Sequence, residues 1–106
     1  MFRQDYIRRA IEQLAAALAR ALGLAPSQPT EALECLREAK GALPIVPGML
    51  DDMSPEDLLE SLGPQSAEVL ARVLAMEADL LEKQGRPLLA ARPRRQSERL
   101  RALLGH

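Results

Sequence analysis

The apolar positions of residues 4–22 recur at alternating spacings of four and three, which is the pattern of one helical face. They are Ile7, Ile11, Leu14, Leu18 and Ala21. Gly23 follows as the expected end of the helix, because glycine is common just beyond helix C-termini. A second face carries the small residues Ala15, Ala16 and Ala19. The pattern therefore predicts a first helix from about Gln4 to Leu22, with an alanine face that lets another helix approach closely.

A second helix is predicted from Thr30 to about Leu43, with Thr30 as its N-cap. Its expected apolar face is Ala32, Leu33, Leu36, Ala39 and Leu43. Residues 44–53 contain two prolines and a glycine and read as a linker that packs down on the core.

A short third helix should begin at Ser54, with Pro55 in its first position and Asp57 three residues after the cap. Gly63 and Pro64 end it. We predict a long fourth helix over 65–84, terminated by Gly85.

The last helical segment is expected from about Pro87 to Leu104. Pro93 falls inside it, where proline removes a backbone hydrogen bond and crowds the preceding turn. This predicts either a kink or a break near Ala91 with a new helix beginning at Pro93.

Composition supports an all-α fold of about five helices. Among 106 residues there are 20 Leu and 17 Ala, but only three Ile and three Val, so few β-branched residues are available for strands. The length suits a single helical domain over 1–106.

Two stretches resemble tetratricopeptide repeats, which pair antiparallel helices with small residues at the crossing. In residues 31–44, EALECLREAKGALP, the matching positions are Ala32, Leu36, Ala39 and Pro44. In residues 74–90 they are Ala78, Leu81, Gly85 and Ala90. The opening DYIRRAIEQLAAALARALGL also resembles a family of small bacterial proteins built as tetratricopeptide-like helical hairpins.

This resemblance implies a fold and no established activity. The expected organisation is a first hairpin at 1–44, a linker and short inserted helix at 45–63, and a second, degenerate hairpin at 64–106 that ends in a basic helix. A plain bundle of four or five helices is the alternative.

Charge is unevenly distributed, although the net charge is only −1. Residues 1–82 carry seven Lys and Arg against fourteen Asp and Glu, whereas residues 83–106 carry seven against one. A basic C-terminal helix laid on an acidic body explains this balance, since opposite potentials attract. The alternatives are a contact with nucleic acid or with a membrane surface.

No residue set indicates a reaction, a metal or a cofactor, so we predict a protein that is not an enzyme. Cys35 and His106 are the only cysteine and histidine, which excludes metal sites of the Cys/His type and suits a reducing cytoplasm. Glu77 lies near an otherwise apolar face. It is either a buried acid or, as we expect, an ion-pair partner for Arg8, Arg9 or a C-terminal arginine.

The sequence therefore favours a scaffold or interaction module that binds another protein or peptide and forms a homodimer. The candidate partner contacts are Arg92, Arg94, Arg95, Arg99, Arg101, Leu100, Leu103 and Leu104. The alanine face of the first helix is a further candidate for the dimer contact. The alternative function is nucleic-acid binding through the basic C-terminal helix. The absence of aromatic residues that stack bases and the acidic net charge argue against it.

Overall fold

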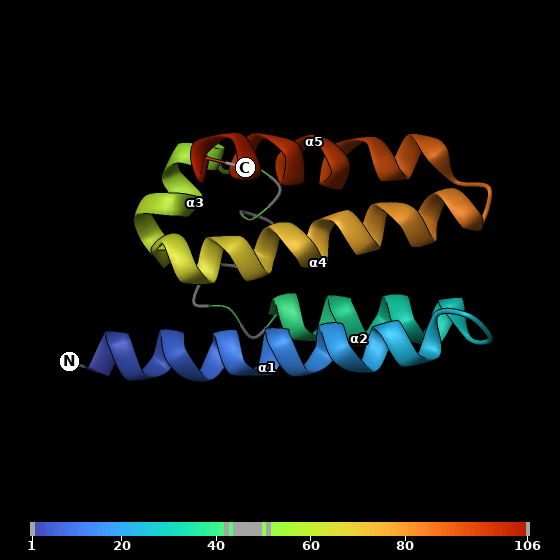
Figure 1. The fold of residues 1–106 in the computed structure, drawn as a ribbon, viewed down its shortest axis with the longest axis horizontal. Coiled ribbons are helices and arrows are strands. Elements are labelled where there is room, and N and C mark those ends of the chain that lie inside the picture. Colours follow the sequence, from blue (N-terminus) through green and yellow to red (C-terminus); the bar gives the residue numbers. More distant parts are fainter. Residues whose placement is uncertain (1, 42, 44–49, 51, 106) are drawn as a thin grey trace.

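The computed structural model describes residues 2–41, 43, 50 and 52–105, and side chains from Arg8 onward. These residues form five α-helices and no strands (Figure 1), which confirms the predicted all-α class and helix number. The helices are α1 (Phe2–Leu24), α2 (Pro29–Gly41), α3 (Pro55–Leu62), α4 (Pro64–Lys83) and α5 (Pro87–Leu103).

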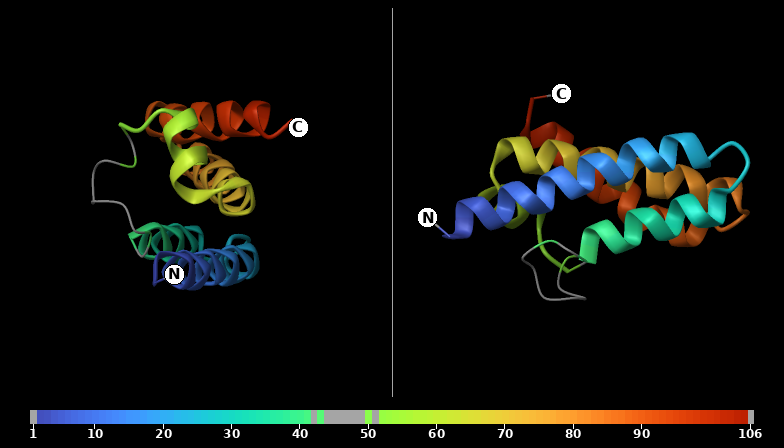
Figure 2. Two further views of the ribbon diagram at one scale, coloured as in Figure 1. Left: turned by 90° about the vertical axis from the view of Figure 1, so that its left-hand side faces the viewer. Right: turned by 90° about the horizontal axis from the view of Figure 1, so that it is seen from below.

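The helix α4 is central, because it contacts each of the other four helices. Figure 2 shows α1 and α2 side by side on one side of α4, with α5 on the opposite side. Within each of the pairs α1–α2 and α4–α5 the two helices run in opposite directions (Figure 1). The short helix α3 contacts both α4 and α5 and closes one end of the molecule.

The buried face of α1 is centred on small residues rather than on the larger apolar ones. From Arg8 onward its buried positions are Ala10, Leu14, Ala17 and Ala21, whereas the side chain of Ile7, also predicted on this face, lies outside those that the structure describes. Ile11 and Leu18 lie at the edge of this face and are only partly buried. Alanines in the centre bring the backbone of α1 close to its neighbours, as expected where two helices cross tightly.

The helix α2 begins one residue earlier than predicted, at Pro29, so the prediction of Thr30 as N-cap is wrong. Proline suits the first helical position because its φ is already helical and it has no N–H to satisfy. The Thr30 hydroxyl instead accepts a hydrogen bond from Gln84 Nε2 at 3.1 Å, which links the start of α2 to the end of α4. The inward face predicted for this helix, including Ala32 and Leu36, is buried.

The start of α3 follows the prediction. Ser54 has extended backbone angles, its hydroxyl accepts from the Asp57 N–H at 3.1 Å, and Pro55 occupies the first turn. Gly63 alone separates α3 from α4, and its φ of 87° is a conformation that residues with a Cβ rarely adopt. Of the predicted linker, residues 44–49 and 51 lie outside the described residues, and Leu50 is buried.

The helix α5 is continuous through Pro93, so the predicted alternative of a break near Ala91 is wrong. Pro93 has no N–H for the carbonyl of Leu89, four residues earlier. Leu89 is about half exposed, at 54 %, so water can take the place of the missing donor and the helix continues.

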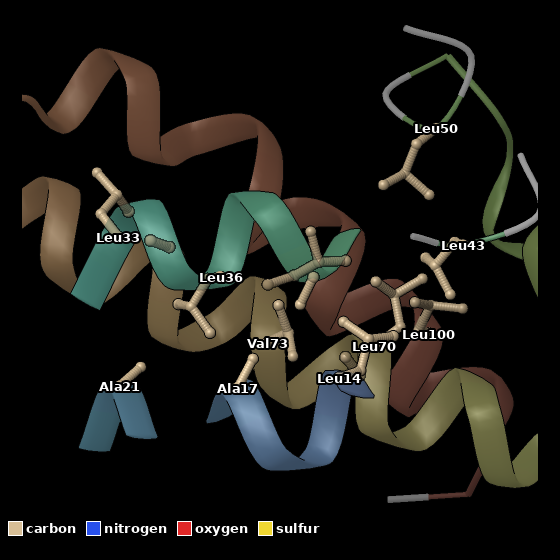
Figure 3. Packing of buried hydrophobic residues seen from close by; sticks show 14 of the residues in the cluster. Leu14, Ala17, Ala21, Leu33, Leu36, Leu43, Leu50, Leu70, Val73 and Leu100 are labelled. Carbon is tan, nitrogen blue, oxygen red and sulfur yellow. The ribbon is translucent and has the colours of Figure 1, made fainter. Parts of the chain in front are cut away.

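The core is built from leucine and alanine. Among the described residues, 22 buried apolar side chains form one cluster, of which nine are alanines. In Figure 3, Leu14 and Ala17 of α1, Leu36 of α2 and Val73 of α4 converge in this cluster. Ala32 and Ala90, the residues proposed for the two close helix crossings, are both buried.

Candidate interaction surface

A groove of about 450 Å³ lies between the segment before α3, together with its first turn, and the outer face of α5. Residues 52–56 line one wall. The α5 wall is formed by Leu88, Ala91, Arg92, Arg95, Gln96 and Arg99. We call this feature the α3–α5 groove. It combines a concave shape with charged side chains that form no ion pair with one another.

Three arginines form a row along the α5 wall. Arg92, Arg95 and Arg99 are spaced by three and four residues, which places them on one face of the helix. All three are exposed, and none makes an ion pair with another described residue. Their charge is therefore directed at solvent, where a partner can use it.

The opposite wall is acidic and partly apolar. It contains the carboxylates of Asp52 and Glu56, together with Met53 and Pro55. Neither carboxylate is paired with an arginine in the described part of the chain. The groove thus presents both signs of charge on facing walls without pairing them internally.

An exposed leucine stands at one end of the arginine row. Leu88 lies one turn before Arg92 and is 91 % exposed, the largest exposure of any large apolar side chain described. Such a side chain in contact with water is unfavourable by about 1.5–3 kcal/mol relative to full burial. Leu88 therefore gives the groove an apolar anchor beside its charges.

The Gln96 side chain is buried and only half satisfied. It is 7 % exposed, and its Nε2 donates to the Leu50 carbonyl at 3.0 Å, whereas Oε1 has no partner. Exchanging the two amide ends would place Oε1 against the Leu50 carbonyl oxygen, two acceptors in contact, so the observed orientation is the better one. A buried acceptor without a donor costs about 1–3 kcal/mol. Because this oxygen is enclosed by the chain itself, it is not accessible to a molecule bound in the groove.

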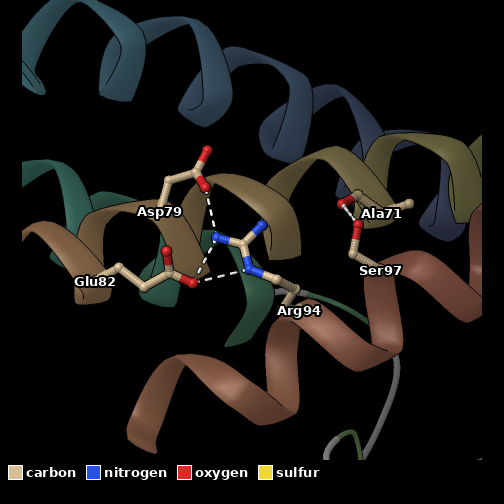
Figure 4. A network of polar contacts seen from close by, with 5 residues as sticks. All are labelled: Ala71, Asp79, Glu82, Arg94 and Ser97. Atoms are coloured by element: carbon tan, nitrogen blue, oxygen red, sulfur yellow. Dashed lines mark hydrogen bonds and ion pairs between the residues drawn. The ribbon is translucent and has the colours of Figure 1, made fainter. Parts of the chain in front are cut away.

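Arg94, a predicted partner contact, is engaged within the chain instead. Its guanidinium donates to Asp79 at 2.6 Å and to Glu82 at 2.9 Å, both on α4 (Figure 4). These hydrogen bonds, to Asp79 first and Glu82 second, raise the pKa of Arg94 above its ordinary value. A raised pKa keeps the guanidinium of Arg94 charged at every pH below that value, so the arginine itself loses its charge only in strong alkali.

Ser97 holds the same two helices together further along α5. Its hydroxyl donates to the Ala71 carbonyl at 2.7 Å, and the residue is buried (Figure 4). Arg94 and Ser97 thus lie on the face of α5 that packs on α4, whereas Arg92, Arg95 and Arg99 lie on the groove face. The basic helix is attached in cis through one arginine, and its four other arginines, three of them on the groove face, form no ion pair with a described residue.

The remaining predicted contacts are divided between core and surface. Leu100 is fully buried, so its prediction as a partner contact is wrong: the side chain completes the core. Leu104 is half-buried and packs against the core. Leu103, 43 % exposed, and the exposed Arg101 remain accessible but lie outside the groove.

The predicted partners of Glu77 are also wrong. Glu77 is buried and accepts a hydrogen bond from Lys40 Nζ at 2.7 Å, and Arg37 Nε lies 4.0 Å from its other oxygen. Both basic residues belong to α2, so this pair joins α2 to α4. No described side chain of α1 or α5 takes part.

The alanine face predicted on α1 is accessible. Ala15, Ala16 and Ala19 are exposed, and Leu22 beyond them is 62 % exposed. Cys35 is half-buried, and its thiol donates to the Ala17 carbonyl at 3.8 Å, a contact internal to the α1–α2 pair. In the described residues no His, Cys, Asp and Glu side chains gather in a group that could hold a metal ion.

Sequence reasoning found the arginines of the groove and missed Leu88, Gln96 and the acidic wall. The signal for Leu88 was present, since it continues the spacing of Arg92, Arg95 and Arg99 by one helical turn. Nothing in the sequence places residues 52–56 beside α5, because that position depends on how α3 packs. No described helix is both long enough and apolar enough to span a membrane. Comparison with protein-family models, with curated proteins and with solved structures finds no match for this chain.

Proposed function

We propose that the protein is a non-enzymatic interaction module that binds a partner protein through the α3–α5 groove. The observation that carries the proposal is the row of three exposed, unpaired arginines beside an exposed Leu88. Arginine is enriched among the residues that contribute most of the affinity at protein interfaces, and burial of an exposed leucine adds apolar area removed from water.

The proposal retains the tetratricopeptide-like architecture expected from the sequence. Burial of Ala32 and Ala90, and the antiparallel course of α1–α2 and α4–α5, support it. A cytoplasmic location suits a chain whose single cysteine has no partner within the chain.

Photo-crosslinking in cells tests this function, because it captures whichever protein occupies the groove. The photoreactive residue p-benzoylphenylalanine replaces Leu88 in the groove, and in the control it replaces Arg101, which is exposed on the same helix outside the groove. We expect an ultraviolet-dependent protein adduct from position 88 that Arg95→Glu removes, and none from position 101. Equal adducts from both positions, or none from position 88, would refute the proposed surface.

Nucleic-acid binding is the second candidate, and the arginine row is the observation that favours it. Asp52 and Glu56 count against it, because they line the same groove and repel phosphates. Three phosphate contacts would give single-stranded DNA binding a log–log salt slope of about −2. Fluorescence anisotropy with a labelled oligonucleotide measures this slope. No binding at low salt rejects the candidate.

The variant for that assay is the triple change of Arg92, Arg95 and Arg99 to glutamine. It is preferable to truncating the chain at Ala91, because truncation would also remove Leu100 from the core.

A further inference from the structure

We propose that the partner seated in the α3–α5 groove is a second copy of the same chain, bound about a two-fold axis. This inference rests on the proposed function, since it assigns a partner to the same surface. A two-fold interface brings one surface patch against itself, so the patch must be complementary to its own rotated image.

The charges of the groove meet that requirement. One wall holds Asp52 and Glu56 and the other holds the arginine row, and no ion pair forms between them within the chain. A two-fold axis through the groove sets the acidic wall of each copy against the basic wall of the other. Every such contact then occurs twice.

Other partners fit one wall and oppose the other. An acidic segment or a nucleic acid would pair with Arg92, Arg95 and Arg99 but meet repulsion from Asp52 and Glu56. A basic segment would pair with Asp52 and Glu56 but be repelled by the three arginines. Only a partner with both signs of charge in the same arrangement satisfies both walls, and the chain itself is one.

The number of charges also suits two copies. Each copy carries three groove arginines and two groove carboxylates, Asp52 and Glu56, so both carboxylates can pair with arginines of the other copy. Gln96 takes no part in this contact, because its Oε1 is enclosed within its own chain.

The exposed Leu88 supplies the apolar part of the contact. It lies at the end of the same row and is 91 % exposed in the single chain. Its neighbour Leu89 is 54 % exposed but does not line the groove, and so provides a matched control for the apolar contribution. Leu88→Ser should weaken the dimer, whereas Leu89→Ser should leave it unchanged.

A charge-exchange experiment tests the symmetry directly. The full-length protein is measured by sedimentation equilibrium, where we expect a species of twice the 11.6 kDa chain mass. Arg95→Glu and Glu56→Arg should each weaken self-association at least about tenfold, because each places like charges in contact at both symmetry-related positions. Mixing the two variants in equal amounts should restore a dimer, because each altered residue then faces its opposite charge.

The control is Arg101→Glu, which makes the same charge change on the same helix outside the groove and should leave the dimer intact. Circular dichroism establishes that each variant keeps its helical content. A dimer that persists in both groove variants, or that fails to return on mixing, overturns the inference.

The two proposals fail in different ways. If the wild-type chain sediments as a monomer at all concentrations while position 88 crosslinks to another protein, the self-association is wrong and the interaction surface stands. If it is a monomer and position 88 gives no adduct, both are wrong. A dimer abolished by Ala19→Glu on α1, but not by Arg95→Glu, also refutes this arrangement.

Discussion

Replacing Lys40 by methionine should destabilise the protein far more than its single charge suggests. The Lys40 side chain is 14 % exposed and its partner Glu77 is 8 % exposed, with 2.7 Å between Nζ and Oε1. Removing one member of such a pair leaves the other charge buried and unpaired, which typically costs about 3–5 kcal/mol.

Arg37 reduces this cost in part. Its Nε lies 4.0 Å from the second Glu77 oxygen, but the side chain is 52 % exposed and still largely hydrated. We therefore expect Lys40→Met to cost about 3 kcal/mol, the lower end of the range. For a domain of this size that is a drop of at least about 10 °C in the melting temperature.

Urea unfolding followed by far-ultraviolet circular dichroism measures the loss. The matched control is Lys83→Met, because Lys83 is exposed and makes no ion pair with any described residue. It should change the free energy of unfolding by no more than about 0.5 kcal/mol. The double variant Lys40→Met/Glu77→Leu removes both charges and should lie within about 1 kcal/mol of wild type.

Two results would refute this reasoning. Equal losses for Lys40→Met and Lys83→Met would show that burial of the pair has no energetic consequence. A double variant as unstable as Lys40→Met alone would show that the loss comes from the packing of the lysine stem and does not arise from the stranded Glu77 charge.

Four further substitutions test the fold. Gly85→Ala should destabilise the fold by about 1 kcal/mol, because Gly85 has a φ of 74°, which alanine rarely adopts. Gly23→Ala, in the exposed end of α1, should instead stabilise it by about 0.5 kcal/mol. In thermal melts the two variants should shift the melting temperature in opposite directions, and shifts in the same direction contradict this reasoning. Ser97→Ala should lose about 1 kcal/mol in urea unfolding through its bond to the Ala71 carbonyl, and an unchanged midpoint would show that this bond contributes nothing. Leu36→Ala, at a fully buried site, should cost about 2–5 kcal/mol, measured by hydrogen exchange of the slowest core amides; unchanged rates would place the site outside the cooperative core.

Features set by neighbouring residues were predictable from the sequence. The cap at Ser54 and Pro55 depends on residues within one turn, and the bend at Gly85 depends on a backbone angle that glycine favours. Burial of Ala32 and Ala90 follows from the helical period of the residues around them. In each case the determining contacts are local, so the sequence contains the needed information.

Features set by tertiary packing were not predictable in the same way. The charge of Glu77 requires a partner, but which helix supplies it depends on how α2 is rotated against α4. By contrast, which α5 arginines face the core and which face solvent could be worked out from their spacing along the helix. Arg94 is four residues after the buried Ala90 and three before the buried Ser97, so it belongs to the packed face.

Core substitutions usually destabilise a protein by removing side-chain volume, but in this alanine-rich core most substitutions destabilise it by adding volume. An alanine has no rotamers to lose on folding, so these positions contribute close contact at little entropic expense. An alanine side chain is a single methyl group, so a substitution at these positions can remove very little volume. Every substitution other than glycine at sites such as Ala32, Ala78 or Ala90 adds volume, which pushes the helix axes apart. In a mutational scan, intolerance at these sites should therefore rise with the size of the incoming side chain, with serine and glycine the most readily accepted.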